Sequence, residues 1–120
     1  MTKNDDVELA KDCPTRQLLE ILSEKWTPAV LYTLSEGTQR TSEIARNIPG
    51  ISKKMLTQTL RNLESWGMVK RKIYQEVPPK VEYTLTALGM RFTEPLRLLC
   101  VWAQENRTHV RRVAERRNQK

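Results

Sequence analysis

The stretch ISKKMLTQTLRNLESWGMVKRK, residues 51–72, decides the fold. On a helix of 3.6 residues per turn it places Leu56, Leu60 and Leu63 on one face, at positions i, i+4 and i+7. The opposite face carries only cations, amides and hydroxyls, namely Lys54, Thr57, Gln58, Arg61 and Ser65. The pattern therefore predicts an amphipathic helix that buries its leucines and presents a polar surface to a ligand.

The ends of this helix and the segment after it are also marked in the sequence. Ser52 is a good N-cap, and Gly67 is a natural C-terminal stop. Beyond Gly67 the apolar period changes from helical to two, in residues 69–74 and again in residues 81–85. The sequence EVPPK between them predicts a stiff turn, because proline cannot donate to a strand ladder. We expect a two-stranded hairpin with basic residues on its first strand.

Other helices are predicted on both sides of this unit. Apolar spacing and end signals place them at residues 14–23, from Thr27 to Gly37, from an N-cap at Thr41 or Ser42 to Pro49-Gly50, and after an N-cap at Thr86. The last of them is long and contains Leu88, Phe92, Leu96, Leu99, Trp102 and Ala103. Pro95 is expected to bend it. In the basic tail after it, Val110 and Val113 suggest another helical turn or two.

The chain carries a regional excess of positive charge. Lysine and arginine number 21 and aspartate and glutamate 14, a formal net charge of +7. Residues 51–80 hold seven basic and two acidic residues, and residues 107–120 hold six basic and one acidic. A surplus of this size favours a polyanionic partner such as nucleic acid.

Several classes of protein are disfavoured. The N-terminus has no apolar signal region and no window approaches the roughly 18 apolar residues of a membrane span, so we expect a cytoplasmic protein without membrane contact. One histidine and two cysteines make no persuasive metal set, and no cofactor is expected. An enzyme is not expected, because His109 lies far from Cys13 in the sequence and no glycine-rich phosphate loop or carboxylate pair is present.

The order of these elements is typical of a winged helix-turn-helix domain, mainly α with a small β-hairpin. The second helix of such a motif enters the major groove of DNA. The hairpin would be the wing, whose cations supply affinity and salt dependence. The candidate DNA contacts are Arg40, Ser52, Lys53, Lys54, Thr57, Gln58 and Arg61 at the helices, and Lys72 and Lys80 on the wing.

Several motifs in order make the chain similar to a known family. They are CP at 13–14, KW at 25–26, RTSEIARNIPGISKKMLTQTLRNLESWGMVKR at 40–71, PPKVEYTLTALG at 78–89, and Trp102. The chain resembles the HxlR-type winged helix-turn-helix transcription regulators, relatives of the MarR group. The resemblance implies a homodimer joined mainly through N-terminal and C-terminal dimerisation helices, with the helix at 52–66 reading double-stranded DNA. The interface candidates are Leu18, Leu22, Leu96, Leu99 and Trp102.

This resemblance suggests three segments. They are a flexible arm at 1–12, the winged helix domain with its dimerisation helices at 13–106, and a basic tail at 107–120. Two features depart from the family pattern. Thr27-Pro28 stands where an apolar run is expected after KW, and the arginine-rich tail extends past the shared motifs.

Cys13 is a candidate redox sensor. It stands beside Pro14 at the expected start of a helix, whose N-terminal field would stabilise the reactive thiolate, with help from Lys11 and Arg16. In a subset of the similar regulators the cysteine at this place senses oxidants or electrophiles. The alternative is a small residue packed at a dimer seam. Cys100 is expected to be inert, although its pairing with Cys13 within or between chains stays open.

Each surface also has a second interpretation. The polar helix face could be solvated only, the last helix could be core, and the basic tail is favoured as a solvated, partly disordered end over a DNA contact. A winged helix can also serve as a protein-interaction module without specific DNA binding. The favoured hypothesis is a dimer that reads an inverted repeat, with a small ligand or an oxidant at Cys13 altering the spacing of its two reading helices.

Overall fold

The helix predicted from the leucine pattern is α4, the central element of the computed structural model, which describes residues 13–119. The predicted arm at 1–12 lies outside the described residues. The elements in chain order are α1 (Pro14–Leu22), α2 (Thr27–Leu34), β1 (Gln39–Arg40), α3 (Thr41–Arg46), α4 (Lys53–Ser65), β2 (Val69–Tyr74), β3 (Lys80–Leu85), α5 (Ala87–Glu105) and α6 (Arg107–Arg117).

Both ends of α4 form as the sequence predicts. The backbone N–H of Met55 donates to Oγ of Ser52 at 3.0 Å, which caps the first turn. At the other end Gly67 adopts a φ of 80°, and the Met68 N–H donates to the Leu63 carbonyl at 2.9 Å. This arrangement closes the helix and sends the chain directly into β2, which suits glycine because a side chain would be strained at that φ.

The leucine face of α4 forms the centre of the core. Leu56 and Leu63 are 0% exposed and Leu60 is 1% exposed. They pack with apolar side chains of α2, α3, the sheet and α5, including Val30, Leu31, Leu34, Ile44, Val69, Leu85 and Leu96. Burial of this face leaves the opposite face of α4 at the surface.

The sheet has one strand more than the sequence predicts. β2 and β3 pair antiparallel from Val69 opposite Leu85 to Tyr74 opposite Lys80, which is the predicted hairpin. The short β1 adds to the other edge of β3, giving the order β1-β3-β2. A strand of two residues is too short to show an alternating pattern, so only its partner strand could reveal it.

The N-cap of α3 is Arg40, so the prediction of Thr41 or Ser42 was wrong by one or two residues. The backbone N–H of Arg40 donates to Oε1 of Glu43 at 2.8 Å. A glutamate in the third helical position can satisfy this N–H, which selects the start of the helix.

The N-terminus of α5 packs against the Gly67–Met68 connection between α4 and β2. Thr86 caps it as predicted, because its Oγ1 accepts from the Gly89 N–H at 3.1 Å and donates to the Gly67 carbonyl at 2.7 Å. Any side chain at Gly89 would collide with the carbonyl of Met68, so glycine is required by close packing there. The capped start of α5 is therefore fixed against the root of the hairpin.

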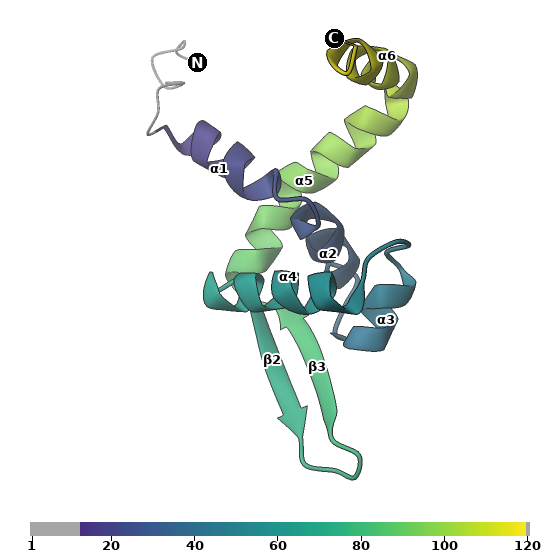
Figure 1. The fold of residues 1–120 in the computed structure, drawn as a ribbon. Helices are drawn as coiled ribbons and strands as arrows, with labels where there is room; N and C mark the ends of the chain where they lie inside the picture. The colour runs from purple at the N-terminus through teal and green to yellow at the C-terminus, as the bar shows by residue number, and fades with distance from the viewer. Residues whose placement is uncertain (1–12, 120) are drawn as a thin grey trace.

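The basic tail forms the helix α6, which is longer than the helical turn or two predicted there and corrects the expectation of partial disorder. None of its residues is buried, as expected for a solvated end. Figure 1 shows α1, the C-terminal part of α5 and α6 projecting from the core at the end opposite the hairpin. The radius of gyration is 17.0 Å, compared with about 14 Å for a compact domain of this length. The molecule is therefore elongated, with a head formed by α2, α3, α4 and the sheet. Among the described residues, no helix has the length and apolar character needed to span a bilayer.

Candidate nucleic-acid interface

The polar face of α4 is open to solvent. Lys54, Gln58, Arg61 and Ser65 are exposed and Thr57 is half-buried. This face presents ammonium, guanidinium, amide and hydroxyl groups, which are the side chains that hydrogen-bond base edges and phosphates. The structure brings together the predicted candidates that belong to α4.

The first turn of α4 concentrates positive charge. Ser52, Lys53 and Lys54 are exposed there, and the turn contains no acidic residue. The N-terminal end of a helix carries partial positive charge, so the two lysines add to an existing anion-attracting field. Because the Ser52 hydroxyl already accepts the Met55 N–H, it can offer its own O–H to an acceptor.

Gln58 is held in place within the free protein. Its Nε2 donates to Oδ1 of Asn62, one helical turn further along, at 3.2 Å. The contact is exposed, so exchanging it for a base edge costs little. Asn62 was not among the predicted contacts, although its spacing of four residues from Gln58 is visible in the sequence.

Arg40 lies apart from α4. It is exposed at the end of β1, opposite Glu82 in the β1–β3 pair. The structure therefore places this candidate at the junction of the sheet and α3 rather than on the polar face of α4.

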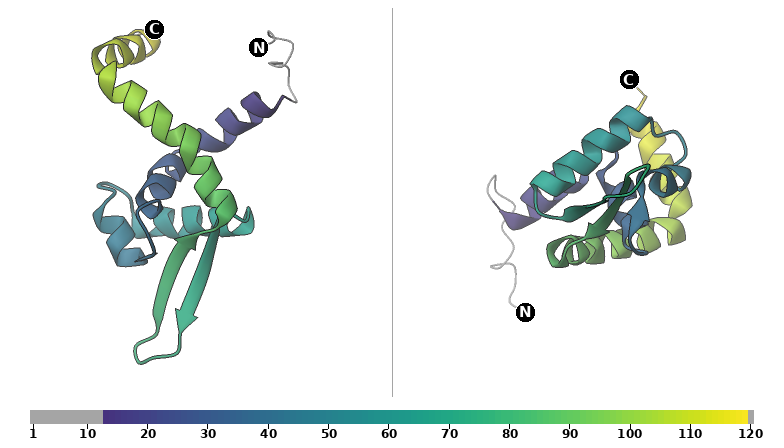
Figure 2. Two further views of the ribbon diagram at one scale, coloured as in Figure 1. Left: turned by 180° about the vertical axis from the view of Figure 1, so that it is seen from behind. Right: turned by 90° about the horizontal axis from the view of Figure 1, so that it is seen from below.

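The wing carries the remaining predicted cations. Nζ of Lys80 lies 3.6 Å from Oε2 of Glu82, whereas Lys72 is exposed and has no ion pair within the described residues. Nε of Arg71 lies 3.6 Å from Oε2 of Glu64 and links the wing to α4. Figure 2 shows α4 and α5 on opposite sides of this hairpin when the molecule is seen from below.

The proposed interface leucines fall into two groups. Leu22 and Leu96 are 8% and 5% exposed, so they belong to the core of the protomer and have little surface left for a partner. Their assignment to the interface stays a prediction that the protomer by itself does not support. Leu18 is half-buried, whereas Leu99 and Trp102 are 51% and 56% exposed.

Further apolar side chains are exposed around Leu99 and Trp102. We name the whole set the distal apolar surface, and it consists of Leu98, Leu99, Val101 and Trp102 on α5 with Val110 and Val113 on α6. A groove of about 390 Å³ runs between the two helices and is lined by Trp102, His109, Val110, Val113 and Ala114. The sequence reasoning missed the part on α6, although valines three residues apart already suggested a helical stripe there.

Cys13 is the N-cap of α1. Its Sγ accepts the backbone N–H of Arg16 at 3.3 Å, and the residue is 4% exposed. Lys11 lies outside the described residues. Cys13 and the half-buried Cys100 are both free thiols. The predicted helix-start position is therefore confirmed, and the thiol is packed rather than open to solvent.

Residues 21–111 match the HxlR-like helix-turn-helix family. This chain belongs to that family. The match covers the head, the wing, α5 and the first residues of α6. The predicted family and the predicted winged helix-turn-helix fold are confirmed.

The chain is similar to other proteins over most of its length. The HTH-type transcriptional regulator YkvN of Bacillus subtilis (strain 168) is 53% identical over 83 residues, which is 69% of this chain and 70% of YkvN. The HTH-type transcriptional regulator YtfH of Escherichia coli (strain K12) is 41% identical over 108 residues, 90% of this chain and 86% of YtfH. The structure of the redox regulator HypR in its reduced form superposes with a TM-score of 0.77 at 36% identity, covering 82% of this chain and 97% of HypR.

Proposed function

We propose that this protein is a transcriptional regulator that binds DNA in a sequence-specific manner as a homodimer on an inverted-repeat operator. The observation that carries the proposal is the division of α4, with its leucines buried in the head and its exposed face polar and cationic beside the wing. YkvN and YtfH, which are similar over most of this chain, are named as HTH-type transcriptional regulators.

The chemistry of the α4 face suits the major groove. Gln58 can bond an adenine bidentately, Arg61 can bond guanine or phosphate, and the hydroxyl of Thr57 can bond either type of base. Lys53 and Lys54 lie in the first turn, where phosphates are also attracted by the helix N-terminus. The wing lysines would supply a contribution that depends on salt and not on sequence.

Selection from a random DNA pool tests the proposal directly. The purified, reduced protein is offered random duplexes at near-physiological salt, where nonspecific phosphate binding is suppressed. Enrichment of a palindrome with half-sites about one helical turn apart is the expected result. Weak binding without enrichment would instead favour a protein-interaction module.

Replacing Gln58 by alanine is expected to relax specificity at one base pair of each half-site. The loss should be about 1–3 kcal/mol of discrimination, roughly 5- to 150-fold, because a bidentate contact with a base is removed. Competition between single-mismatch duplexes measures it. The matched control is Gln104→Ala, an exposed glutamine on α5, which should leave discrimination unchanged. Equal discrimination by Gln58→Ala and wild type would remove Gln58 from the reading face.

The homodimer part of the proposal is supported by surface that the protomer leaves uncovered. Helix α6 has 11 residues, none of them buried, and its described neighbour is the end of α5. An isolated helix of this length is marginal in water, so packing must support it. A second copy can cover the distal apolar surface and place two α4 helices symmetrically on a palindrome.

Control of DNA binding by thiol oxidation is a second element of the proposal. HypR, similar in fold and 36% identical, is named as a redox regulator and is known in reduced and oxidised forms. In this chain Cys13 stands at the N-terminus of α1, the helix that enters the core next to α2. Transfer of an oxygen atom from hydrogen peroxide to Sγ gives a sulfenic acid and water. The larger polar group cannot keep the packing of a thiol that is 4% exposed.

Replacing Cys13 by serine is expected to remove the response to peroxide. Serine can keep the helix cap, because its Oγ can accept the Arg16 N–H that Sγ accepts now. In wild type, peroxide should change operator affinity by roughly 5- to 150-fold, the usual range of coupling between two sites. Cys100→Ser is the matched control and should respond as wild type does. A Cys13→Ser protein that still responds to peroxide would exclude Cys13 as the sensor and leave a small ligand as the effector.

A further inference from the structure

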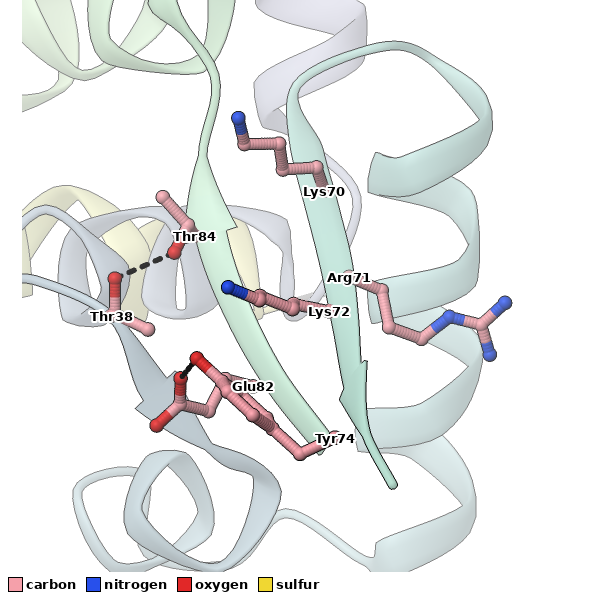
Figure 3. Close-up of a pocket in the computed structure, with 7 residues that line it drawn as sticks. All are labelled: Thr38, Lys70, Arg71, Lys72, Tyr74, Glu82 and Thr84. Carbon is pink, nitrogen blue, oxygen red and sulfur yellow. Dashed lines mark hydrogen bonds between the residues drawn. The ribbon is translucent and has the colours of Figure 1, made fainter. Parts of the chain in front are cut away.

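The face of the sheet turned away from α4 contains a polar pocket of about 480 Å³. We name it the wing pocket. It is lined by Thr38, Lys70, Arg71, Lys72, Tyr74, Glu82 and Thr84, which come from β2, β3 and the loop before β1. Figure 3 shows these side chains along the hairpin, from Lys70 near its root to Tyr74 at the far end of β2.

Alternation along β2 places its three consecutive cations, Lys70, Arg71 and Lys72, on two faces of the sheet. Lys70 and Lys72 project from the same face, and Arg71 projects from the other one, toward Glu64 of α4 (Figure 3). Arg71 is thus already paired, whereas both lysines line the pocket. Two like charges on neighbouring positions of one sheet face repel each other unless an anion lies between them.

The one carboxylate that lines the pocket is already occupied. Oε1 of Glu82 accepts the hydroxyl of Tyr74 at 2.9 Å, and Oε2 lies 3.6 Å from Nζ of Lys80. The Nζ atoms of Lys80 and Lys72 also lie over the ring of Tyr74, at 4.7 Å and 4.9 Å from its centroid. Since Lys80 balances Glu82, the charge of Lys70 and Lys72 is left uncompensated within the wing pocket.

Two hydroxyls complete the site. Oγ1 of Thr38 and Oγ1 of Thr84 lie 2.6 Å apart, and Lys72 points toward them in Figure 3. Only one of the two hydroxyl hydrogens is used between them, so the second can be donated to a ligand. A hydroxyl donor with Lys72 directed toward it, and a second ammonium group on the same face of the sheet, supply donors that a tetrahedral oxyanion accepts.

We propose that the wing pocket binds a phosphate group through Lys70, Lys72 and the Thr38–Thr84 hydroxyl pair. The phosphate belongs either to the DNA backbone beside a half-site or to a small phosphorylated molecule. Binding of a DNA phosphate rests on the proposed function, whereas binding of a small phosphorylated molecule does not. Lys80 is not assigned to this pocket, because it does not line it and its Nζ is paired with Glu82.

The first arm of the test uses inorganic phosphate and the full-length protein, at constant ionic strength. Saturable shifts of the backbone amide NMR signals of Lys70, Lys72 and Thr84 are expected. The double variant Lys70→Ala/Lys72→Ala should weaken this binding by roughly tenfold or more, because two charge-assisted contacts are lost. Thr84→Val, which keeps a β-branched residue in β3, should weaken it without loss of charge and so tests the hydroxyl pair separately from folding of the hairpin.

The second arm measures the salt dependence of duplex binding, which nonspecific DNA also reports. If the pocket holds a DNA phosphate, the slope of log K against log salt should fall by about 0.9 in the double variant. If the double variant loses binding of inorganic phosphate but keeps the salt slope of wild type, the site is assigned to a small phosphorylated molecule. The matched control is Arg111→Ala/Arg112→Ala, which removes two exposed charges on α6, far from the wing (Figure 1).

Two results would contradict the proposal that the wing pocket binds phosphate. One is a wild-type protein without saturable phosphate binding whose salt slope matches that of the double variant. The other is an equal loss of phosphate affinity or an equal change of salt slope in the α6 control. That result would mean that both quantities report only the net charge of the protein. Neither result depends on finding an operator, so failure of the wing pocket is distinguishable from failure of the proposed function.

Discussion

Replacing Leu99 and Trp102 together by glutamate is expected to convert the proposed homodimer into monomers and to weaken operator binding by roughly 100-fold or more, the usual scale of bivalent gain. Both side chains are more than half exposed in the protomer, so the protomer core does not need them. In a dimer they would lie in an apolar contact, where an unpaired carboxylate is costly to bury. A palindrome bound by a monomer engages only one half-site at a time.

Light scattering gives the mass of the variant, and titration of the operator gives its affinity. The control is Gln104→Glu/Gln119→Glu, which adds two carboxylates at exposed polar positions near the same end of the molecule. It should remain dimeric and bind as wild type does. Persistence of a full-affinity dimer in the Leu99/Trp102 variant would place the interface on another surface.

Replacing Leu60 by alanine is expected to lower the free energy of unfolding by about 2–5 kcal/mol. Leu60 is 1% exposed at the centre of the head, where α4 packs on α2. Its removal leaves a cavity among residues that are themselves fully buried, so the loss includes both transfer and cavity contributions. A loss of this size is a large part of the total stability of a domain.

Urea unfolding at one fixed protein concentration measures this change, because the stability of the proposed homodimer would depend on concentration. Arg61→Ala is the neighbouring control on the exposed face, and alanine suits a helix, so its stability should change by less than about 0.5 kcal/mol. The pair of variants thus separates the two faces of α4. A loss below about 1 kcal/mol for Leu60→Ala would contradict the role of the leucine face as the core.

Local signals in the sequence predicted the part of the structure that carries the proposed function. The leucine spacing of α4, its Ser52 cap and its Gly67 stop depend on residues within one or two helical turns of one another. Alternation in β2 and β3 and the Thr86 cap of α5 are local in the same sense. Such patterns can be read without knowing what packs against them.

Features that depend on distant residues were not visible in the sequence. The two residues of β1 become a strand only because β3 lies beside them. Leu22 and Leu96 look like Leu99 in a helical pattern, yet the fold buries the first two and exposes the third. Helix α6 was underestimated because its composition is charged.

What the sequence by itself determined is the winged helix-turn-helix order and the polar face of α4, because helix and hairpin patterns repeat over a few residues. Only the tertiary structure decided which cations are free. It paired Arg71 with Glu64 and Lys80 with Glu82, partners that depend on strand register and helix packing. Lys70 and Lys72 are therefore left without an ion pair among the described residues, and the strength of a charge depends on its neighbours in space.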